Sequence, residues 1–230
     1  MEVTEAVSAA LAARNLMRAA RVATLATSDA GQPFASLVTP TTAVDGSVLL
    51  LLSDLSPHTR HLRAEPRCSL LFAGAPAETN PQTAPRVTVL GAAVPEPDPA
   101  LKARWVALHP YAAFYADFGD FRLWRVRPAA AHYVGGFASA HRLQGAELLP
   151  DPDTAARIAV AEPEIIARCN ADHPDATARI VACDGDGFDL ASGETVLRVP
   201  FPAPVGNPEA VQAALQLARN GFASVAGPRV

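Results

Sequence analysis

The sequence predicts an α+β fold in which an antiparallel, closed or partly closed β-barrel is followed by a small α+β domain. Short β-prone runs alternate with turn signals and short helical patterns, as in antiparallel barrels. The dipeptide Asp45-Gly46 joins two such runs and is a strong hairpin signal. A linker rich in Pro and Asp, residues 149–153, precedes a change of pattern. We therefore assign residues 1–147 to the barrel domain and residues 154–230 to the small domain.

The first elements of the barrel follow from spacing and turn chemistry. Ala, Leu and Met recur at helical spacing from about Thr4 to Arg21, with acidic residues early and basic residues late, as the helix dipole favours. The β-prone run Val22–Thr27 ends at the turn signal Ser28–Gly31. Two further strands, Phe34–Ala43 and Ser47–Ser53, meet at the Asp-Gly hairpin.

The later elements of the barrel begin with a helix that has Ser56 as its N-cap and Pro57 at its first position, and that ends before Pro66. Pro128 marks a bulge or an edge position in the last strand. The remaining predicted elements are two strands, a helix and a long strand or strand pair: Cys68–Ala73, Arg86–Val94, Pro99–Leu108 and Phe121–Val134. About six strands are therefore expected.

The small domain should begin with a helix over Thr154–Asp172. A second helix or a helix-to-strand step follows at Ala176–Cys183. The acidic run Asp184–Asp189 resembles half of a calcium loop but lacks the closing Glu, which favours a plain β-turn. Two short strands and a helix to about Ala218 complete the domain. Asn170, Asp172 and His173, at the end of the first helix, form a capping cluster or a metal site.

Composition excludes several classes of function. The net charge of −4 and the lack of a basic block argue against nucleic acid as a partner. Three Cys at wide spacing exclude a disulfide framework, a zinc ribbon and covalent c-type haem, and favour a cytoplasmic protein. The longest apolar run, Val48–Leu52, is strand-sized, so no membrane span or membrane partner is expected. The N-terminus does not read as a signal peptide, and no P-loop, GxGxxG, HExxH or GxSxG motif is present.

Two segments are candidates for a binding site. Aromatic side chains gather between Tyr111 and His141, which suits either a flat conjugated ligand or a strand packed on a barrel core. In the segment 53–62, a strand ends and a helix begins. Its hydroxyls, with Arg60 and His58, form either a phosphate or carboxylate site or an ordinary capped helix.

Several stretches of the sequence resemble one superfamily. VATLAT, GQPFASLVTP, LLLLSDLSPHTRHLRAEPRCSLLF and RVTVLGAA look like the FMN-binding split barrel of the pyridoxamine-phosphate-oxidase superfamily. The later run YADFGDFRLWRVRPAAAHYVGGFASA resembles its haem-utilisation branch, the HugZ-type proteins. The C-terminal words EIIARCNADHPDA, GFDL and VLRVPFPAPV look like the accessory domain fused to those proteins. The resemblance covers nearly the whole chain.

The resemblance implies a homodimer that holds FMN or haem in a cleft between its two subunits. It places the flavin phosphate against a set of hydroxyl and cationic side chains, with Arg86 facing the cleft. That set is Ser36, Ser53, His58, Thr59 and Arg60. The oxidases carry Arg where Ser36 stands and Lys about where His58 stands, and each charge-assisted bond contributes roughly 1.5–3 kcal/mol. Weak FMN binding and no vitamin B6 oxidation are therefore expected.

For haem, the resemblance implies an iron ligand just past the last barrel strands, and His141 suits this position best. His132 is the alternative ligand, and Arg142 is placed to pair with a propionate. Three functions follow as hypotheses. The first is haem handling or oxidative degradation for iron acquisition. The second is an FMN-dependent oxidoreductase, and the third is a non-catalytic ligand-binding dimer.

Overall fold

The computed structural model describes residues 2–136 and 139–225. The chain divides into two compact units, Met1–Pro150 and Asp151–Val230, so the division falls inside the predicted linker. That each unit folds as an independent domain stays a prediction. No described helix combines the length and the hydropathy that crossing a membrane requires.

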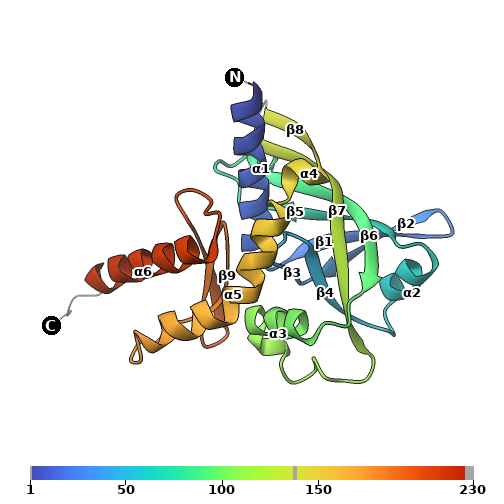
Figure 1. Ribbon diagram of the computed structural model, residues 1–230. Helices are drawn as coiled ribbons and strands as arrows, with labels where there is room; N and C mark the ends of the chain where they lie inside the picture. Colours follow the sequence, from blue (N-terminus) through green and yellow to red (C-terminus); the bar gives the residue numbers. More distant parts are fainter. Residues whose placement is uncertain (1, 137–138, 226–230) are drawn as a thin grey trace. The chain divides into compact units, whose positions relative to one another are not determined.

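The described residues of the first unit contain one antiparallel sheet of eight strands (Figure 1). Its strand order is β2-β1-β5-β6-β7-β4-β3, and β8 pairs with the far end of β7. In chain order the strands are β1 (Ala23–Asp29), β2 (Gln32–Val38), β3 (Pro40–Thr42), β4 (Val48–Ser53), β5 (Arg67–Ala73), β6 (Arg86–Pro95), β7 (Phe121–Gly136) and β8 (Ser139–Gln144). The expected α+β split-barrel fold is therefore confirmed.

Helices cover parts of this sheet. Helix α1 (Glu2–Ala19) contacts β3 and β5 to β8, whereas α3 (Pro99–Leu108) contacts β4. Helix α3 has the predicted bounds because Asp98 caps it, accepting a hydrogen bond from the Ala100 amide at 2.8 Å. The other helical elements are α2 (Pro57–Ala64), α4 (Gly145–Leu148), η1 (Pro81–Thr83) and η2 (Pro110–Ala112).

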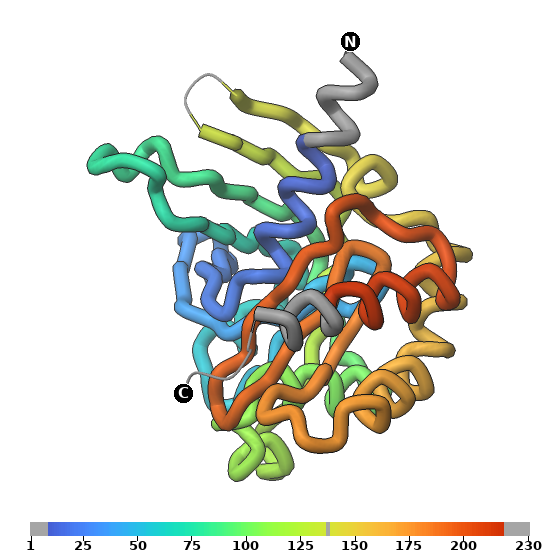
Figure 2. Tube along the Cα trace, turned by 90° about the vertical axis from the view of Figure 1, so that its left-hand side faces the viewer, coloured from blue at the N-terminus to red at the C-terminus, as the bar shows by residue number. Residues whose placement is uncertain are grey.

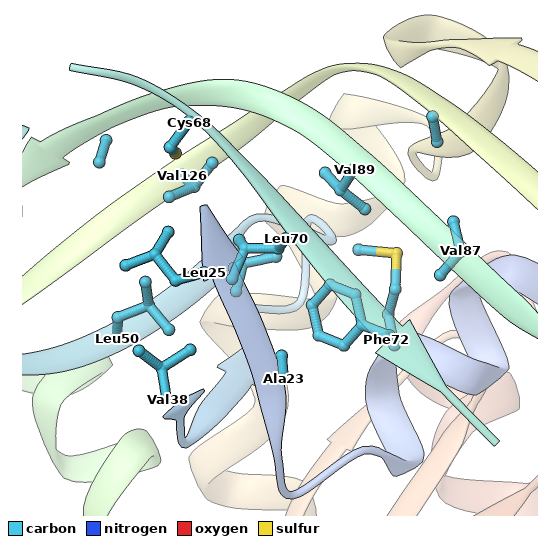
Figure 3. Packing of buried hydrophobic residues seen from close by; sticks show 14 of the residues in the cluster. Ala23, Leu25, Val38, Leu50, Cys68, Leu70, Phe72, Val87, Val89 and Val126 are labelled. Atoms are coloured by element: carbon cyan, nitrogen blue, oxygen red, sulfur yellow. The ribbon is translucent and has the colours of Figure 1, made fainter. Parts of the chain in front are cut away.

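One face of the sheet, called the inner face here, carries the main hydrophobic core. Alternate residues of β1, β5 and β6 point into it, as strand periodicity requires. Figure 3 shows the packing of the labelled residues: Ala23, Leu25, Val38, Leu50, Cys68, Leu70, Phe72, Val87, Val89 and Val126. Helix α1 adds Ala10, Ala13 and Met17 to the same cluster. The inner face is thus filled by side chains.

The opposite, outer face is covered only around β4 and the start of β7. A second buried cluster lies there, in which Trp105 of α3 packs with Leu49, Leu51 and Leu123. The Trp105 indole also donates a hydrogen bond to the Thr39 carbonyl at 3.1 Å. Away from this cluster, outer-face residues of β2, β5 and β6 are exposed, among them Leu37, Leu71 and Leu90.

The structure corrects three sequence-based expectations. The single strand predicted over Phe34–Ala43 is two strands that lie at opposite ends of the strand order, β2 beside β1 and β3 beside β4. The break lies before Pro40, whose missing N–H and fixed φ interrupt a ladder. Strand β8 was not predicted. Ser56 is the N-cap of α2 by position, but its side chain makes no capping hydrogen bond.

The expected irregularity at Pro128 is confirmed as a β-bulge. Between β6 and β7 the register jumps, so that Leu90 pairs with Ala130 while Gly91 pairs with Pro128, leaving Ala129 as an extra residue. Gly91 allows the strands to approach at this point, because a Cβ there would lie 2.6 Å from the Arg127 carbonyl oxygen.

The second unit is a three-stranded antiparallel sheet with two helices. Its elements are α5 (Pro152–Ala171), β9 (Arg179–Asp184), β10 (Gly187–Ser192), β11 (Thr195–Pro200) and α6 (Pro208–Val225), with strand order β11-β10-β9. The segment Ala176–Cys183 thus leads into a strand. Asn170 ties α5 to β9, since its amide exchanges two hydrogen bonds with the backbone of Ile180.

The acidic turn of the second unit takes part in a buried ion-pair network. Arg198 donates to Asp184 at 2.7 Å and to Asp189 at 3.0 Å, and the side chains of all three are almost fully buried. Among the described residues, no group of three His, Cys, Asp or Glu side chains is arranged to hold a metal ion. The turn is therefore a structural feature, consistent with the β-turn interpretation.

Candidate functional site

The predicted site residues lie at two ends of the first unit's longest strand. Ser53 pairs with Phe121 at the start of β7, whereas His132 pairs with Arg142 near its end. At about 3.3 Å per residue, the strand between Phe121 and His132 spans roughly 35 Å. One copy of the chain therefore keeps Ser53 and the predicted haem ligand His132 at opposite ends of β7.

The hydroxyls at the first end are already hydrogen-bonded within the protein. The Ser53 hydroxyl donates to the Asp120 carboxylate at 2.6 Å, and the Thr59 hydroxyl donates to the Ser53 carbonyl at 2.7 Å. Ser36 and His58, which come from β2 and α2, meet at 3.1 Å between Oγ and Nδ1. The structure thus brings these four residues together, but as mutual partners and beside an acidic side chain.

Positive charge is scarce at this end. Burial, and then the neighbouring His61, lower the pKa of His58, so its imidazole is neutral at pH 7. Arg60 donates to the Leu55 carbonyl at 3.0 Å. It also lines a groove of about 480 Å³ between the β1–β2 turn and α2, in which Asp29 and Glu65 supply opposite charge. The hydrogen-bond partners found for these hydroxyls among the described residues are a carboxylate, backbone groups and a neutral imidazole, and none is a cation.

His61 was not predicted as part of this region. Its Nδ1 lies 3.1 Å from the Thr27 hydroxyl, its Nε2 lies 3.7 Å from the Asp29 carboxylate, and its ring meets Phe34 edge-on at 5.1 Å. Its spacing of three residues from His58 on α2 was the available signal. Together the two histidines fasten α2 to the β1–β2 hairpin.

At the second end, His132 and Arg142 lie opposite each other on β7 and β8, on the outer face (Figure 2 shows these strands side by side in yellow-green). Thr88 of β6 is the partner of His132 on its other side, so it shares this face. Arg86 lies two residues before it on β6, and its guanidinium donates to the carbonyls of Gln82 and Ala84 at 3.0 and 3.1 Å. Three predicted residues therefore share one sheet face.

His141 lies on the other face. Its strand partner is Tyr133, which is paired in turn with the core residue Val87. The two rings stack at a centroid distance of 6.5 Å, and His141 Nε2 lies 3.3 Å from the Ser139 hydroxyl. The two candidate haem ligands therefore lie on opposite faces of the sheet.

The aromatic segment that begins at Tyr111 is not one site either. Tyr115 and Phe121 pack against the buried cluster beneath α3, whereas Phe114 and Phe118 are exposed. His109, just before this segment, is fully buried beside Trp105, and its Nε2–H donates a hydrogen bond to the Pro40 carbonyl at 3.1 Å. Burial lowers the pKa of His109 to about 4.

Comparison with known proteins places these features in context. Residues 10–135 match the family model described as pyridoxamine 5'-phosphate oxidase. The chain is 35% identical over 196 residues to a chloroplastic non-canonical heme oxygenase, HOZ, of Arabidopsis thaliana. The match covers 75% of this chain and 60% of that relative, so the chain spans less than two thirds of its length.

Solved structures extend the similarity into the second unit. A heme binding protein from Mycobacterium smegmatis is 29% identical, with a TM-score of 0.57, over 93% of this chain and 98% of that one. A protein of unknown function from Agrobacterium tumefaciens is 27% identical, with a TM-score of 0.75, over 91% of this chain and 94% of that one. The similarity to the Mycobacterium smegmatis protein therefore includes most of both units.

Proposed function

The chain belongs to the pyridoxamine 5'-phosphate oxidase family, and from this premise we propose that it binds haem and handles or oxidatively degrades it for iron acquisition. The observation that carries the proposal is the 29% identity to the Mycobacterium smegmatis heme binding protein across 93% of the chain. The 35% identity over 196 residues to the Arabidopsis thaliana heme oxygenase is a second, separate similarity that supports the proposal.

The residues at the flavin-phosphate position do not fit FMN. A bound phosphate carries close to two negative charges and needs charge-assisted donors. Ser36 and His58 replace two cations of the oxidases, His58 is neutral, and Asp120 presents a carboxylate to the neighbouring hydroxyl of Ser53. Placing a phosphate here would set it against that carboxylate and break existing hydrogen bonds.

The other end of the sheet fits haem. Neutral imidazole is an ordinary axial donor for haem iron, and guanidinium groups pair with propionates. His132 and Arg142 offer both on one exposed face beside Leu71 and Leu90, which are 39% and 49% exposed. Bound haem would supply an iron whose redox state and ligation the protein sets through its axial ligand.

We propose further that the protein is a homodimer that closes over this open face. Leu37, Leu71 and Leu90 are between 39% and 75% exposed, and they lie on the outer face of β2, β5 and β6. Large apolar side chains exposed on one face of a sheet are typical of an interaction site. Two open faces opposite each other would leave a seam in which a planar ligand is sheltered from water.

Absorbance titration with haemin tests the proposal. We expect a saturable shift of the Soret band, and in a parallel fluorescence-quenching titration we expect FMN to bind at least about tenfold more weakly, because its phosphate lacks cationic partners. Adding ascorbate under air then separates the two forms of the proposal. A persistent Soret band means handling, and its loss with release of iron means degradation.

FMN-dependent oxidoreductase activity remains the second candidate, and the match of residues 10–135 to the oxidase family favours it. Tighter binding of FMN than of haemin would replace the haem proposal with this one. Binding of neither pigment would overturn both and leave the non-catalytic ligand-binding dimer.

A further inference from the structure

We propose that His132, on the open outer face, is the axial ligand of the haem iron, and that Arg142 pairs with a propionate there. This inference rests on the proposed function and names the residues that carry it. It selects the alternative that the sequence left second, because the sheet register separates His132 from His141. The evidence comes from the state of each histidine and from the surface around His132.

An axial ligand needs a ring nitrogen that is free to bind iron. Four of the six histidines already use ring nitrogens in contacts within the protein. They are His58 with Ser36, His61 with Thr27, His109 with the Pro40 carbonyl and His141 with Ser139. His132 is exposed, and its ring has no partner among the described residues. Iron binding at His132 therefore breaks no existing contact.

His173 is the other histidine whose ring has no partner within the described chain. It follows α5 in the second unit, between Asp172 and a Pro-Asp step that ends at Asp175. Haem carries two propionates, and these adjacent carboxylates would repel them. The surroundings of His132 are different in charge and in shape.

Two outer-face rows of paired residues form the surface beside His132. The first row has one residue on each of six successive strands, from β2 to β8: Leu37, Thr24, Leu71, Thr88, His132 and Arg142. The second runs parallel to it: Ala35, Ala26, Ser69, Leu90, Ala130 and Gln144. None of these side chains, all of which are described, is acidic.

Most side chains of the second row are short, because they belong to Ala or Ser, whereas those of the first row extend further from the sheet. A porphyrin is flat and apolar over most of its area, so the short side chains beside His132 leave room above the sheet for a ring that is bound through the imidazole. Leu90, between Ser69 and Ala130 in the second row, and Leu71 in the first row supply exposed apolar contact. Burying such apolar area on binding favours the complex.

Positive charge lies at the β7–β8 edge of this surface. Arg142 is the direct strand partner of His132, and Arg127 lies beyond Ala130 on the same face of β7. Both guanidinium groups are exposed and have no ion-pair partner among the residues that the structure describes. A ligand with an apolar body, a metal and two carboxylates at one edge matches the leucines, the imidazole and the guanidinium groups, in that order.

Site-directed variants of the full chain, titrated with haemin, test the assignment. His132→Ala should weaken haemin binding at least about tenfold and remove the spectrum of an imidazole-ligated iron, and added imidazole should restore that spectrum. His132→Cys should convert it to the spectrum of a thiolate-ligated iron, which a purely structural role would not do. Arg142→Ala should weaken binding by a smaller factor and reduce its dependence on salt.

His141→Ala is the matched control, and it should leave both spectrum and affinity unchanged. Because His132 is exposed, thermal melting of the His132 variants should match that of the unaltered protein. A His132 variant that keeps the original haem spectrum overturns the inference while haem binding itself stands. An unaltered protein that gives no Soret shift overturns the proposed function as well.

Discussion

The same face of β7 is closed at one end of the strand and open at the other. At the start, Leu123 is 4% exposed, because α3 lays Trp105 over it and seals the cluster with Leu49 and Leu51. Toward the end, Leu71 on β5 and Leu90 on β6 are 39% and 49% exposed, and His132, which pairs with Arg142, is also exposed. One strand thus serves the fold at one end and is available for binding at the other.

The difference shows how histidine acquires opposite roles on one sheet. At the closed end, His109 is buried against Trp105, and burial lowers the pKa of its imidazole. It therefore contributes to packing as a neutral ring. At the open end, the exposed ring of His132 has no partner among the residues that the structure describes, which leaves its nitrogens available for the proposed ligand. Burial, and not residue type, separates the structural imidazole from the candidate ligand.

Truncation of the closed end should have the largest effect. Trp105→Ala removes a side chain that is 1% exposed, together with its hydrogen bond to Thr39, and should lower the free energy of unfolding by about 3–5 kcal/mol. Leu37→Ala, at a position that is 75% exposed, should change it by less than about 0.5 kcal/mol. Urea unfolding measures both, and similar losses would contradict the contrast between the ends.

The second-largest effect should be a fall in the free energy of unfolding at acid pH, caused by His109 at the closed end. His109 has a pKa of about 4 in the folded chain, below its ordinary value of 6.5, so the unfolded chain binds the extra proton between these values. The stabilisation is complete above pH 6.5 and is lost as the pH falls toward 4, by about 2–3 kcal/mol. Unfolding free energies measured across this range should show the fall.

The variant His109→Gln isolates this contribution. It keeps a donor for the Pro40 carbonyl but does not titrate, so the fall with acid should be shallower than in the unaltered chain. His58, whose pKa is also lowered, is present in both proteins and cancels in the comparison. Equal slopes would mean that His109 is not the group responsible.

A charge on the open end should have the smallest effect on folding and act on association instead. Leu71→Asp places a carboxylate in the proposed dimer seam, where its desolvation should weaken self-association at least about tenfold, or roughly 1.4 kcal/mol. Leu55→Asp, at a 75% exposed position beside the closed end, is the matched control. Sedimentation velocity compares them, and a monomeric unaltered protein would remove the dimer proposal.

Much of the fold could be predicted from local signals. The helix predicted over Pro99–Leu108 is α3, and the Asp-Gly step predicted the turn before β4. The split of Phe34–Ala43 could not be predicted, because its two halves pair with strands far apart in the sheet. Strand β8 escaped because Gly135 and Gly136 indicated an exit from the sheet, whereas β8 turns back and pairs with β7.

The site could be predicted only as a set of residues. Ser36 and His58 were named together, and the structure joins them at 3.1 Å. That these two side chains are hydrogen-bond partners of each other depends on how α2 packs, which no local pattern encodes. The opposite orientation of His132 and His141 depends on strand register, a long-range property.

The bulge at Ala129 has a consequence for how this chain is compared with others. Before it, the even-numbered residues Trp124 and Val126 point into the core, and after it the odd-numbered Ala131 does so. The extra residue therefore reverses the parity of the strand and turns His132 away from the barrel interior. An alignment that closes the gap at Ala129 would equate His132 with a core position and hide an imidazole that faces outward.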